Sequence, residues 1–291
     1  MFHGSIPALI TPFKNGAIDR DAFANLIERQ IEGGSAALVP CGTTGESATL
    51  SHAEHREVVE LCISVAAGRL PVIAGAGSNS TSEAIELVEH AKSAGADAAL
   101  VICPYYNKPD QAGLEAHFGA INDAVSMPVL LYNVPGRTAC DLLPDTVARL
   151  AKLPNIVGIK DATGDLGRVS LHTSLTAGEQ FVQVSGDDPS ALGFLAMGGS
   201  ACISVTANVA PALCAAMHEA FQDGDMETAQ LIEARLIALH NAMFVSPSPA
   251  PAKYVLEKLG LCSNEVRLPI VAPNADACKA IDDAMARAGL S

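Results

Sequence analysis

The sequence predicts an α/β fold, an eight-stranded parallel (β/α)8 TIM barrel followed by a C-terminal helical extension. Short apolar runs recur every roughly 20 to 35 residues and are continuous rather than alternating, as in strands buried on both faces. Apolar residues at helical spacing separate these runs, and the strand signal stops after residue 222. We therefore expect residues 1–222 to form the barrel and residues 223–291 to form a helical region.

The eight predicted strands cover residues 5–10, 36–39, 72–74, 98–102, 129–131, 156–159, 182–184 and 201–205. Apolar stripes over 58–65, 84–91 and 114–125 predict helices between them, and Ser51-x-x-Glu54 and Ser80-x-x-Glu83 predict capping boxes at helix starts. A further stripe over 229–243 ends at the Pro-rich residues 246–251, and two more helices are expected near 252–260 and 274–289.

A doubly wound open sheet would give the same alternation and would bind a nucleotide at a Gly-rich first turn. The segment Gly75-Ala76-Gly77-Ser78-Asn79-Ser80 lacks the third glycine of that turn, and no phosphate loop is present in the sequence. Nucleotide binding is therefore the weaker hypothesis.

The composition disfavours several classes of function. With 18 basic and 32 acidic residues the formal charge is −14, so nucleic acid and anionic membranes are not expected partners. The eight cysteines are scattered, which indicates neither a disulfide framework nor a zinc site and makes reduced thiols in the cytoplasm the expectation. No apolar run approaches the roughly 18 residues that a membrane span needs.

Lys160 is the only cationic residue in the apolar strand that ends at this position. The carboxyl ends of barrel strands are where active sites of this fold lie. A lysine amine with an ordinary pKa of about 10.4 is almost fully protonated at pH 7, and burial in an apolar interior would favour the neutral, nucleophilic form. The alternative is a lysine that reaches from the strand end into water.

Two other segments carry polar groups at strand ends, and Tyr132 and Arg137 belong to the same one. Tyr132 offers a phenol for proton transfer, or is a core tyrosine with a satisfied hydroxyl. Arg137 offers a guanidinium for a carboxylate, or is a surface arginine. Thr43 and Thr44 lie between glycines, where amides and hydroxyls can hold a carboxylate or phosphate, or they belong to an ordinary turn.

Two pairs of residues resemble metal ligands, but the further ligands that a metal site needs are not identified. His52 and His55 could share a helix face, but further ligands cannot be identified, and solvated first-turn histidines are more common. Asp187 and Asp188 follow Gly186, where a helix N-cap is the more common role. No metal site is predicted.

Four ordered segments, residues 41–46, 105–109, 132–138 and 158–161, together resemble the dihydrodipicolinate synthase (4-hydroxy-tetrahydrodipicolinate synthase) family. The resemblance covers nearly the whole chain. It implies a lyase of the pyruvate-dependent class I aldolases, built on a catalytic barrel. Such an enzyme forms homotetrameric dimers of dimers, needs no metal or organic cofactor, and acts in the diaminopimelate route of lysine biosynthesis.

The resemblance also implies roles for individual residues. Lys160 would form a Schiff base with pyruvate, and the enamine derived from it would attack L-aspartate 4-semialdehyde. Tyr132, Thr44 and Tyr106 would relay protons, with Tyr106 crossing from a neighbouring subunit. The remaining substrate-binding positions would be Thr43 and Thr44 for the pyruvate carboxylate, Arg137 for the semialdehyde carboxylate, and Gly186 and Ile203 along the pocket.

Allosteric inhibition by L-lysine is a further implication of the resemblance. The positions that resemble the family's lysine cleft are Ser47, Ala48, His52, His55, Asn79, Glu83 and Tyr105. The alternatives left open are a related aldolase such as N-acetylneuraminate lyase, or a non-catalytic pyruvate-binding regulator. The first motif and Arg137 favour the synthase over the lyase, and the intact Lys160 and Tyr132 disfavour a pure binder.

Overall fold

The computed structural model describes residues 2–290, which form two compact units. One unit consists of Ile73–Ile203 with residues 2 and 3, and we call it the central unit. The other consists of Gly4–Val72 with residues 204–290, and we call it the terminal unit. The predicted division at residue 222 is a different one and stays a prediction.

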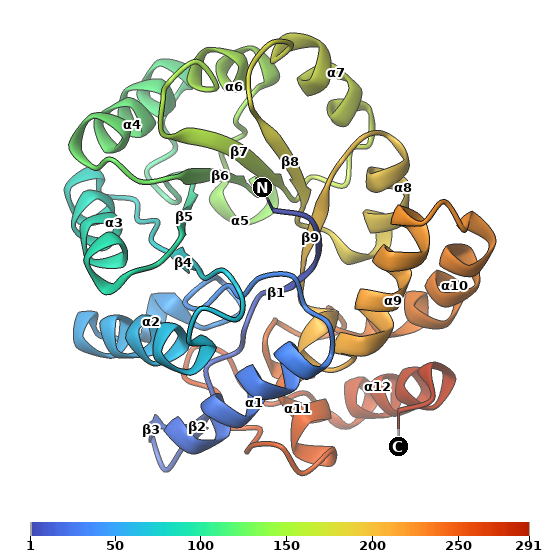
Figure 1. The fold of residues 1–291 in the computed structure, drawn as a ribbon. Helices are drawn as coiled ribbons and strands as arrows, with labels where there is room; N and C mark the ends of the chain where they lie inside the picture. The colour runs from blue at the N-terminus through green and yellow to red at the C-terminus, as the bar shows by residue number, and fades with distance from the viewer. Residues whose placement is uncertain (1, 291) are drawn as a thin grey trace. The chain divides into compact units, whose positions relative to one another are not determined.

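The central unit is a parallel sheet covered by helices. Its strands are β4 (Ile73–Gly75), β5 (Ala98–Ile102), β6 (Val129–Asn133), β7 (Ile156–Asp161), β8 (Val182–Ser185) and β9 (Ala201–Ser204). Each pairs in parallel with the next along the chain. Figure 1 shows the sheet curving with α3, α4, α6 and α7 along its outer side. All strand carboxyl ends therefore lie at the same edge of the sheet.

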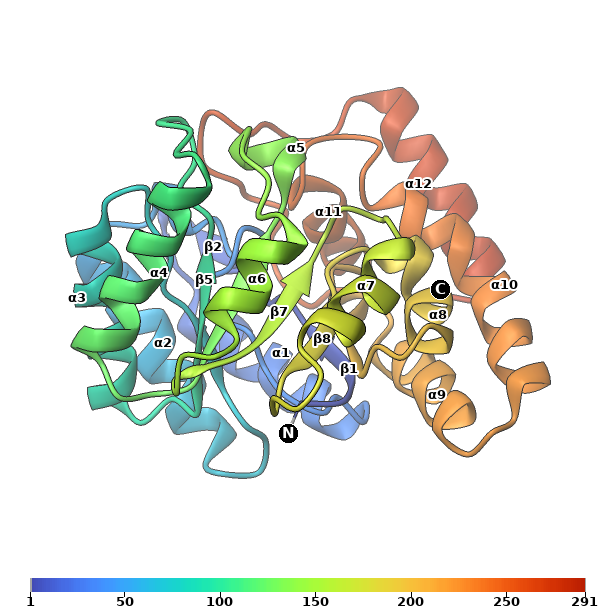
Figure 2. The same cartoon turned by 90° about the horizontal axis from the view of Figure 1, so that it is seen from above.

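The helices of the central unit are α3 (Thr81–Ala94), α4 (Gln111–Ala124), the short α5 (Pro135–Thr138), α6 (Pro144–Leu150), α7 (Gly167–Leu175), the 3-10 turn η2 (Asp188–Ser190) and α8 (Ala191–Ala196). Figure 2 shows α6 and α7 flanking β7. Their buried residues follow helical spacing, as Ala84, Val88 and Ala91 do in α3, so one face of each helix covers the sheet.

The terminal unit is mostly helical. It contains β1 (Gly4–Pro7), the hairpin β2 (Phe13–Lys14) and β3 (Ala17–Ile18), α1 (Arg20–Glu32), η1 (Ser47–Thr49), α2 (His52–Ala66), η3 (Thr206–Asn208), α9 (Pro211–Gln222), α10 (Met226–Ala242), α11 (Ala250–Lys258) and α12 (Ala275–Ala288). Helix α10 packs against α9 and α12. The helices predicted after residue 222 are confirmed.

The strand predicted over residues 36–39 is wrong in extent. Only two isolated parallel bridges form there, Val39 with Ala8 and Leu38 with Val72. Pro40 has no N–H to extend a ladder, and Cys41 takes a left-handed conformation with φ 54°, so the extended backbone ends at once. The other predicted strands form with small shifts of their bounds.

One of the two predicted capping boxes forms. Ser51 and Glu54 exchange both hydrogen bonds at the start of α2. Ser80 makes no side-chain cap on α3, because Ser78 takes over both partners: its hydroxyl donates to the Glu83 carboxylate and accepts from the Ser80 amide at 3.1 Å. The box predicted at Ser80 and Glu83 is therefore wrong.

Candidate active site

Lys160 and Tyr132 lie side by side at the carboxyl ends of β7 and β6. They are direct partners in the parallel register, and the Lys160 Nζ lies 4.2 Å from the centroid of the Tyr132 ring. Each residue is only 6% exposed. The reading of Lys160 as a lysine reaching into water is therefore wrong, and the structure places a buried amine against a buried phenol ring.

Gly186 leaves the space that the Lys160 side chain occupies. A Cβ atom added to Gly186 would lie 2.8 Å from the Lys160 Cε and 2.7 Å from the Ala162 Cβ. Its amide donates to the Asp161 carbonyl at 2.7 Å, which fixes this close approach. Any larger residue here would displace the lysine side chain.

A polar network begins one residue beyond Lys160 and Tyr132. Asn133 and Asp161 follow them in the strands, are again register partners, and are buried. Asn133 donates to Asp141 at 2.8 Å, and Arg168 donates to both Asp141 oxygens at 2.9 and 2.5 Å. Because strand side chains alternate, this network holds the strand ends from the side opposite to the amine and the phenol.

The network is closed by Asp161 itself. Its Oδ1 accepts from the amide and hydroxyl of Thr163 at 2.8 and 2.6 Å, and its Oδ2 lies 3.7 Å from Arg168. Burial lowers the pKa of Arg168, but the hydrogen bonds and charge of Asp141 and the charge of Asp161 outweigh it and raise that pKa overall. Sequence reasoning missed this support, although a polar residue after each site residue was a visible signal.

The loops after β5 and β6 present Tyr106 and Arg137 to the outside. Tyr106 is 88% exposed and has φ 72°, a left-handed conformation that is unusual for a bulky residue. Asn107 next to it donates to the Asn79 carbonyl at 2.8 Å, which ties this loop to the loop after β4. Arg137 is exposed on α5, whereas Ile203 is buried in β9.

In the terminal unit, Thr43 and Thr44 occupy a tight turn. The Gly45 amide donates to the Gly42 carbonyl at 3.0 Å and the Glu46 amide to the Thr43 carbonyl at 3.1 Å. The Thr11 hydroxyl donates to the Gly45 carbonyl at 2.7 Å. The turn is thus fixed by its own backbone and by a neighbouring segment, as a preformed anion site would require.

Glu46 anchors this turn to the C-terminal part of the unit. Its Oε1 accepts from the Lys253 Nζ at 2.5 Å and its Oε2 from the Arg267 amide at 2.9 Å. Lys253 is fully buried, lies 4.1 Å over the Phe13 ring and also donates to the Glu265 carbonyl at 2.7 Å. Burial lowers the pKa of Lys253, although the charge and hydrogen bond of Glu46 act to raise it. We call Glu46 with its partners Lys253 and Arg267 the Glu46 anchor.

Arg267 extends the anchor to the start of α2. Its guanidinium donates to both Glu54 oxygens at 2.9 and 2.6 Å and to the Thr49 carbonyl at 3.0 Å. The hydrogen bonds from Arg267, followed by those within the Ser51 capping box, lower the pKa of Glu54 to about 2, although burial acts in the opposite direction. Sequence reasoning missed the anchor, because its members are more than 200 residues apart.

The residues predicted to bind lysine fall into both units. In the central unit, Asn79 and Glu83 belong to the loop and first turn after β4, and Tyr105 follows β5. In the terminal unit, Ser47 and Ala48 lie in η1, and two histidines lie in the first turn of α2. His55 is 7% exposed, so the expectation of a solvated residue is wrong for it, whereas His52 is exposed.

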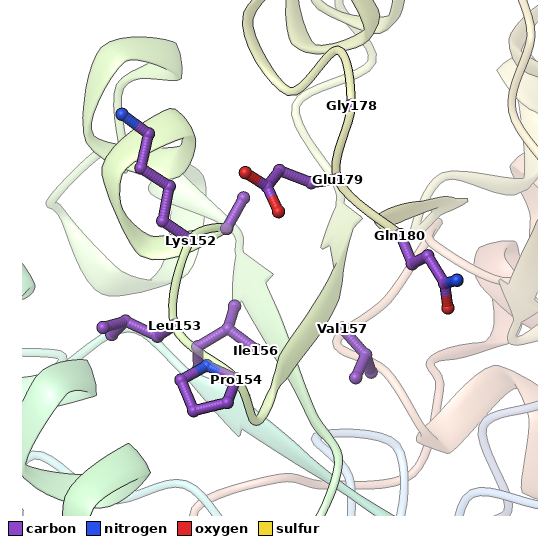
Figure 3. A pocket seen from close by; sticks show the side chains of 9 residues that line it. Lys152, Leu153, Pro154, Ile156, Val157, Gly178, Glu179 and Gln180 are labelled. Atoms are coloured by element: carbon purple, nitrogen blue, oxygen red, sulfur yellow. The ribbon is translucent and has the colours of Figure 1, made fainter.

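A pocket of about 320 Å³ lies at the opposite ends of the strands. It is lined by residues 151–154 and 156–157, before and at the start of β7, and by residues 178–180 before β8. Figure 3 shows the loop of Lys152 and Pro154 facing the loop of Glu179 and Gln180 across it. The pocket therefore lies at the amino ends, away from Lys160.

Among residues 2–290, no group of three or more His, Cys, Asp and Glu side chains is arranged to hold a metal ion. Asp187 stands at the N-cap position of η2, but its carboxylate accepts from the Ser190 hydroxyl at 2.6 Å instead of capping the backbone. No helix within the same residues is long and apolar enough to cross a membrane.

Comparison with known proteins supplies the family. Residues 1–288 match the profile of the dihydrodipicolinate synthetase family. The chain belongs to this family. It is 73% identical to the 4-hydroxy-tetrahydrodipicolinate synthase of Hyphomonas neptunium, with all of both chains covered.

Solved structures of the family match the whole fold. The chloride-inhibited dihydrodipicolinate synthase of Acinetobacter baumannii, complexed with pyruvate, gives a TM-score of 0.97 at 43% identity, covering 100% of both chains. The synthase of Cyanidioschyzon merolae with lysine bound gives 0.96 at 40% identity, covering 100% of this chain and 99% of the other. The predicted fold class, a TIM barrel with C-terminal helices, is confirmed, and the open-sheet alternative is wrong.

Family membership also confirms the predicted class of activity. The chain is an enzyme, a lyase of the class I aldolase type with 4-hydroxy-tetrahydrodipicolinate synthase activity, and it belongs to lysine biosynthesis. N-acetylneuraminate lyase and a non-catalytic regulator are thereby set aside.

Proposed function

We propose that this chain condenses pyruvate with L-aspartate 4-semialdehyde through a Schiff base at Lys160. The observation that carries the proposal is the buried Lys160 amine, packed on the Tyr132 ring at the carboxyl end of β7. A buried lysine beside a phenol is suited to attack a ketone, and the related A. baumannii enzyme is complexed with pyruvate.

In the proposed reaction the Lys160 amine adds to the ketone of pyruvate and water leaves, giving an imine. Loss of a methyl proton gives an enamine, which attacks the aldehyde carbon of the second substrate. The amine of that substrate then displaces the Lys160 amine from the imine as the ring closes. Tyr132, Thr44 and Tyr106 relay the protons, and no step needs a metal or organic cofactor.

The other proposed substrate contacts are those that the family resemblance implies. Thr43 and Thr44, in the turn held by the Glu46 anchor, bind the pyruvate carboxylate. Arg137, exposed on α5, binds the semialdehyde carboxylate. Gly186 and Ile203 line the substrate-binding pocket around Lys160, and a side chain at Gly186 would collide with the lysine.

We further propose a cytoplasmic homotetramer, a dimer of dimers, in which each subunit receives Tyr106 from a neighbour. An 88% exposed tyrosine held in a strained backbone conformation supports this role, because a partner chain would bury it. The eight free cysteines agree with a reducing compartment.

Borohydride trapping tests the Schiff base. Incubation with pyruvate and borohydride should attach a reduced pyruvyl group to Lys160 and inactivate the enzyme. Lys160→Arg should give no adduct, whereas Lys152→Arg, which changes an exposed lysine, should leave trapping intact. An adduct on another lysine would overturn the proposal, as would turnover of N-acetylneuraminate in place of pyruvate plus aspartate semialdehyde.

L-lysine is the proposed allosteric inhibitor, bound by Ser47, Ala48, His52, His55, Asn79, Glu83 and Tyr105. The lysine-bound C. merolae structure supports the proposal. Glu83 supplies a carboxylate for an ammonium group, and Tyr105 adjoins Tyr106, which offers a route to the proton relay. A coupling of about 1 to 3 kcal/mol, or roughly 5- to 150-fold, is typical of such effectors.

Titration of activity with millimolar lysine tests this site. Glu83→Gln should abolish the inhibition, and Glu86→Gln, an exposed change on the same helix α3, should retain it. Full activity of the unaltered enzyme at millimolar lysine would argue against an allosteric site altogether.

A further inference from the structure

Cys103 and Cys140 form a dithiol that the proposed reaction does not use. Cys103 follows β5 directly and is fully buried, and its amide donates to the Tyr132 carbonyl at 2.9 Å. Cys140 comes two residues after α5 and is half-buried. The Cys140 sulfur lies 3.1 Å from the carbonyl oxygen of Pro104, the residue after Cys103, so the two cysteines come from adjoining loops. Each thiol also acts on the pKa of the other. The eight cysteines are otherwise scattered, and both of these are free thiols.

The surroundings of Cys140 give its sulfur the character of a reactive thiolate. The hydrogen bond from Cys103, then that from Thr138, lower the pKa of Cys140 to about 6, against partial burial and the negative charge of Asp141. The same contact raises the pKa of Cys103 well above its ordinary value. The Pro104 carbonyl, 3.1 Å from the Cys140 sulfur, accepts from the thiol form. One partner is thus a partly exposed nucleophile and the other a buried proton donor.

We propose that Cys103 and Cys140 are an oxidation site, at which a hydroperoxide converts the thiol pair into a disulfide linking the loop after β5 to the loop after α5. Both segments adjoin residues of the proposed site, since Tyr105 and Tyr106 follow Cys103 and Arg137 precedes Cys140. The proposal does not rest on the proposed function, because the thiol chemistry is independent of pyruvate.

The reaction balances as two steps. The Cys140 thiolate attacks the hydroperoxide, an S–O bond forms, the O–O bond breaks, and an alkoxide leaves and takes up a proton to become an alcohol. Cys103 then attacks the resulting sulfenic acid, the S–S bond forms, the S–O bond breaks, and water leaves with the Cys103 proton. The two thiols lose two electrons, and the hydroperoxide is reduced.

The pH profile of Cys140 alkylation is a better measure of the lowered thiol pKa than the alkylation rate at neutral pH. A fall in pKa of about three units raises the thiolate fraction at pH 7 from about 1% to about 90%, but it lowers the nucleophilicity of each thiolate roughly 15- to 30-fold. The net gain in rate at pH 7 is therefore only a few-fold, whereas the midpoint of the profile moves by the whole shift.

The test uses iodoacetamide and tert-butyl hydroperoxide with the intact enzyme. Cys140 should alkylate with a midpoint near pH 6, and Cys103→Ser should move that midpoint upward by one unit or more. Cys262 serves as the internal control, because burial raises its pKa to about 11 and it should stay unreacted at pH 7. Peroxide should join the peptides of Cys103 and Cys140 with the loss of two hydrogen atoms, reversibly with dithiothreitol.

A Cys140 that stops at sulfinic or sulfonic acid while Cys103 remains free would overturn the proposal. An unchanged midpoint in Cys103→Ser would overturn it as well. Because Cys103→Ser nearly preserves the size of the buried side chain, circular dichroism of this variant separates a loss of the site from a loss of the fold.

Discussion

The polar network in the central unit and the Glu46 anchor in the terminal unit each hold residues of the proposed site in place. They differ in how far apart their members lie along the chain. In the central unit, Asn133 and Asp161 directly follow Tyr132 and Lys160, and their partners lie within 27 residues. In the terminal unit, Glu46 is held by Lys253 and Arg267, more than 200 residues away. The amine and the phenol are positioned mainly by strand pairing, whereas the Thr43 turn depends on the C-terminal extension.

This difference predicts how each region responds to the loss of one charge. The Glu46–Lys253 pair is almost fully buried, with side-chain exposures of 1% and 0%, so removal of one partner leaves an uncompensated charge. Arg168 and Asp141 are 12% and 36% exposed, so water can solvate what remains. The anchor should therefore be the more fragile of the two.

Lys253→Met should have the largest effect. We expect a loss of about 3 to 5 kcal/mol in the free energy of unfolding, measured with urea, because Glu46 would remain buried without its cation. Lys258→Met on the same helix α11 breaks a pair that is 41% and 40% exposed and should cost less than about 1 kcal/mol. Equal losses in the two variants would mean that the anchor contributes no more than a surface pair.

Asp141→Asn should have an intermediate effect. The amide retains an oxygen for Asn133 but can no longer accept both Arg168 hydrogen bonds as a charged partner, so we expect a loss of about 1 to 2 kcal/mol. The rate of pyruvate trapping should fall as well, because the network lies one residue beyond Lys160. Glu115→Gln, which alters an exposed pair with Arg149, is the control. A stability loss with unchanged trapping would show that strand pairing alone positions the amine.

Glu54→Gln should have the smallest effect and a defined pH dependence. The pKa of Glu54 is lowered from the ordinary 4.5 to about 2, so its stabilisation is fully present above about pH 4.5 and is lost as pH falls toward 2. Because the carboxylate is partly exposed, we expect about 1 kcal/mol at pH 7. Urea unfolding of both proteins at pH 7, 4 and 3 should show the difference shrinking with acid. A constant difference would assign the effect to packing.

The amino-acid pattern alone predicts the parallel α/β fold, the positions of most strands and helices, and the strand-end placement of Lys160 and Tyr132. These features are local, because continuous apolar runs predict buried strands and parallel pairing brings strand ends to one edge. Where these rules failed, a residue close by in the sequence was the cause. Ser78 displaced Ser80 from its capping box, and the turn at Cys41 limited residues 36–39 to single bridges.

Which charges are buried together depends on the folded chain and cannot be seen in the sequence. Neither Lys253 nor Arg267 has a sequence pattern that points to Glu46, and nothing in the spacing of Cys103 and Cys140 indicates that their loops adjoin. Patterns along the chain report periodic burial, whereas an ion pair or a thiol contact depends on where two distant segments meet. That meeting is fixed by the packing of the whole unit, so its chemistry becomes visible only after the chain has folded.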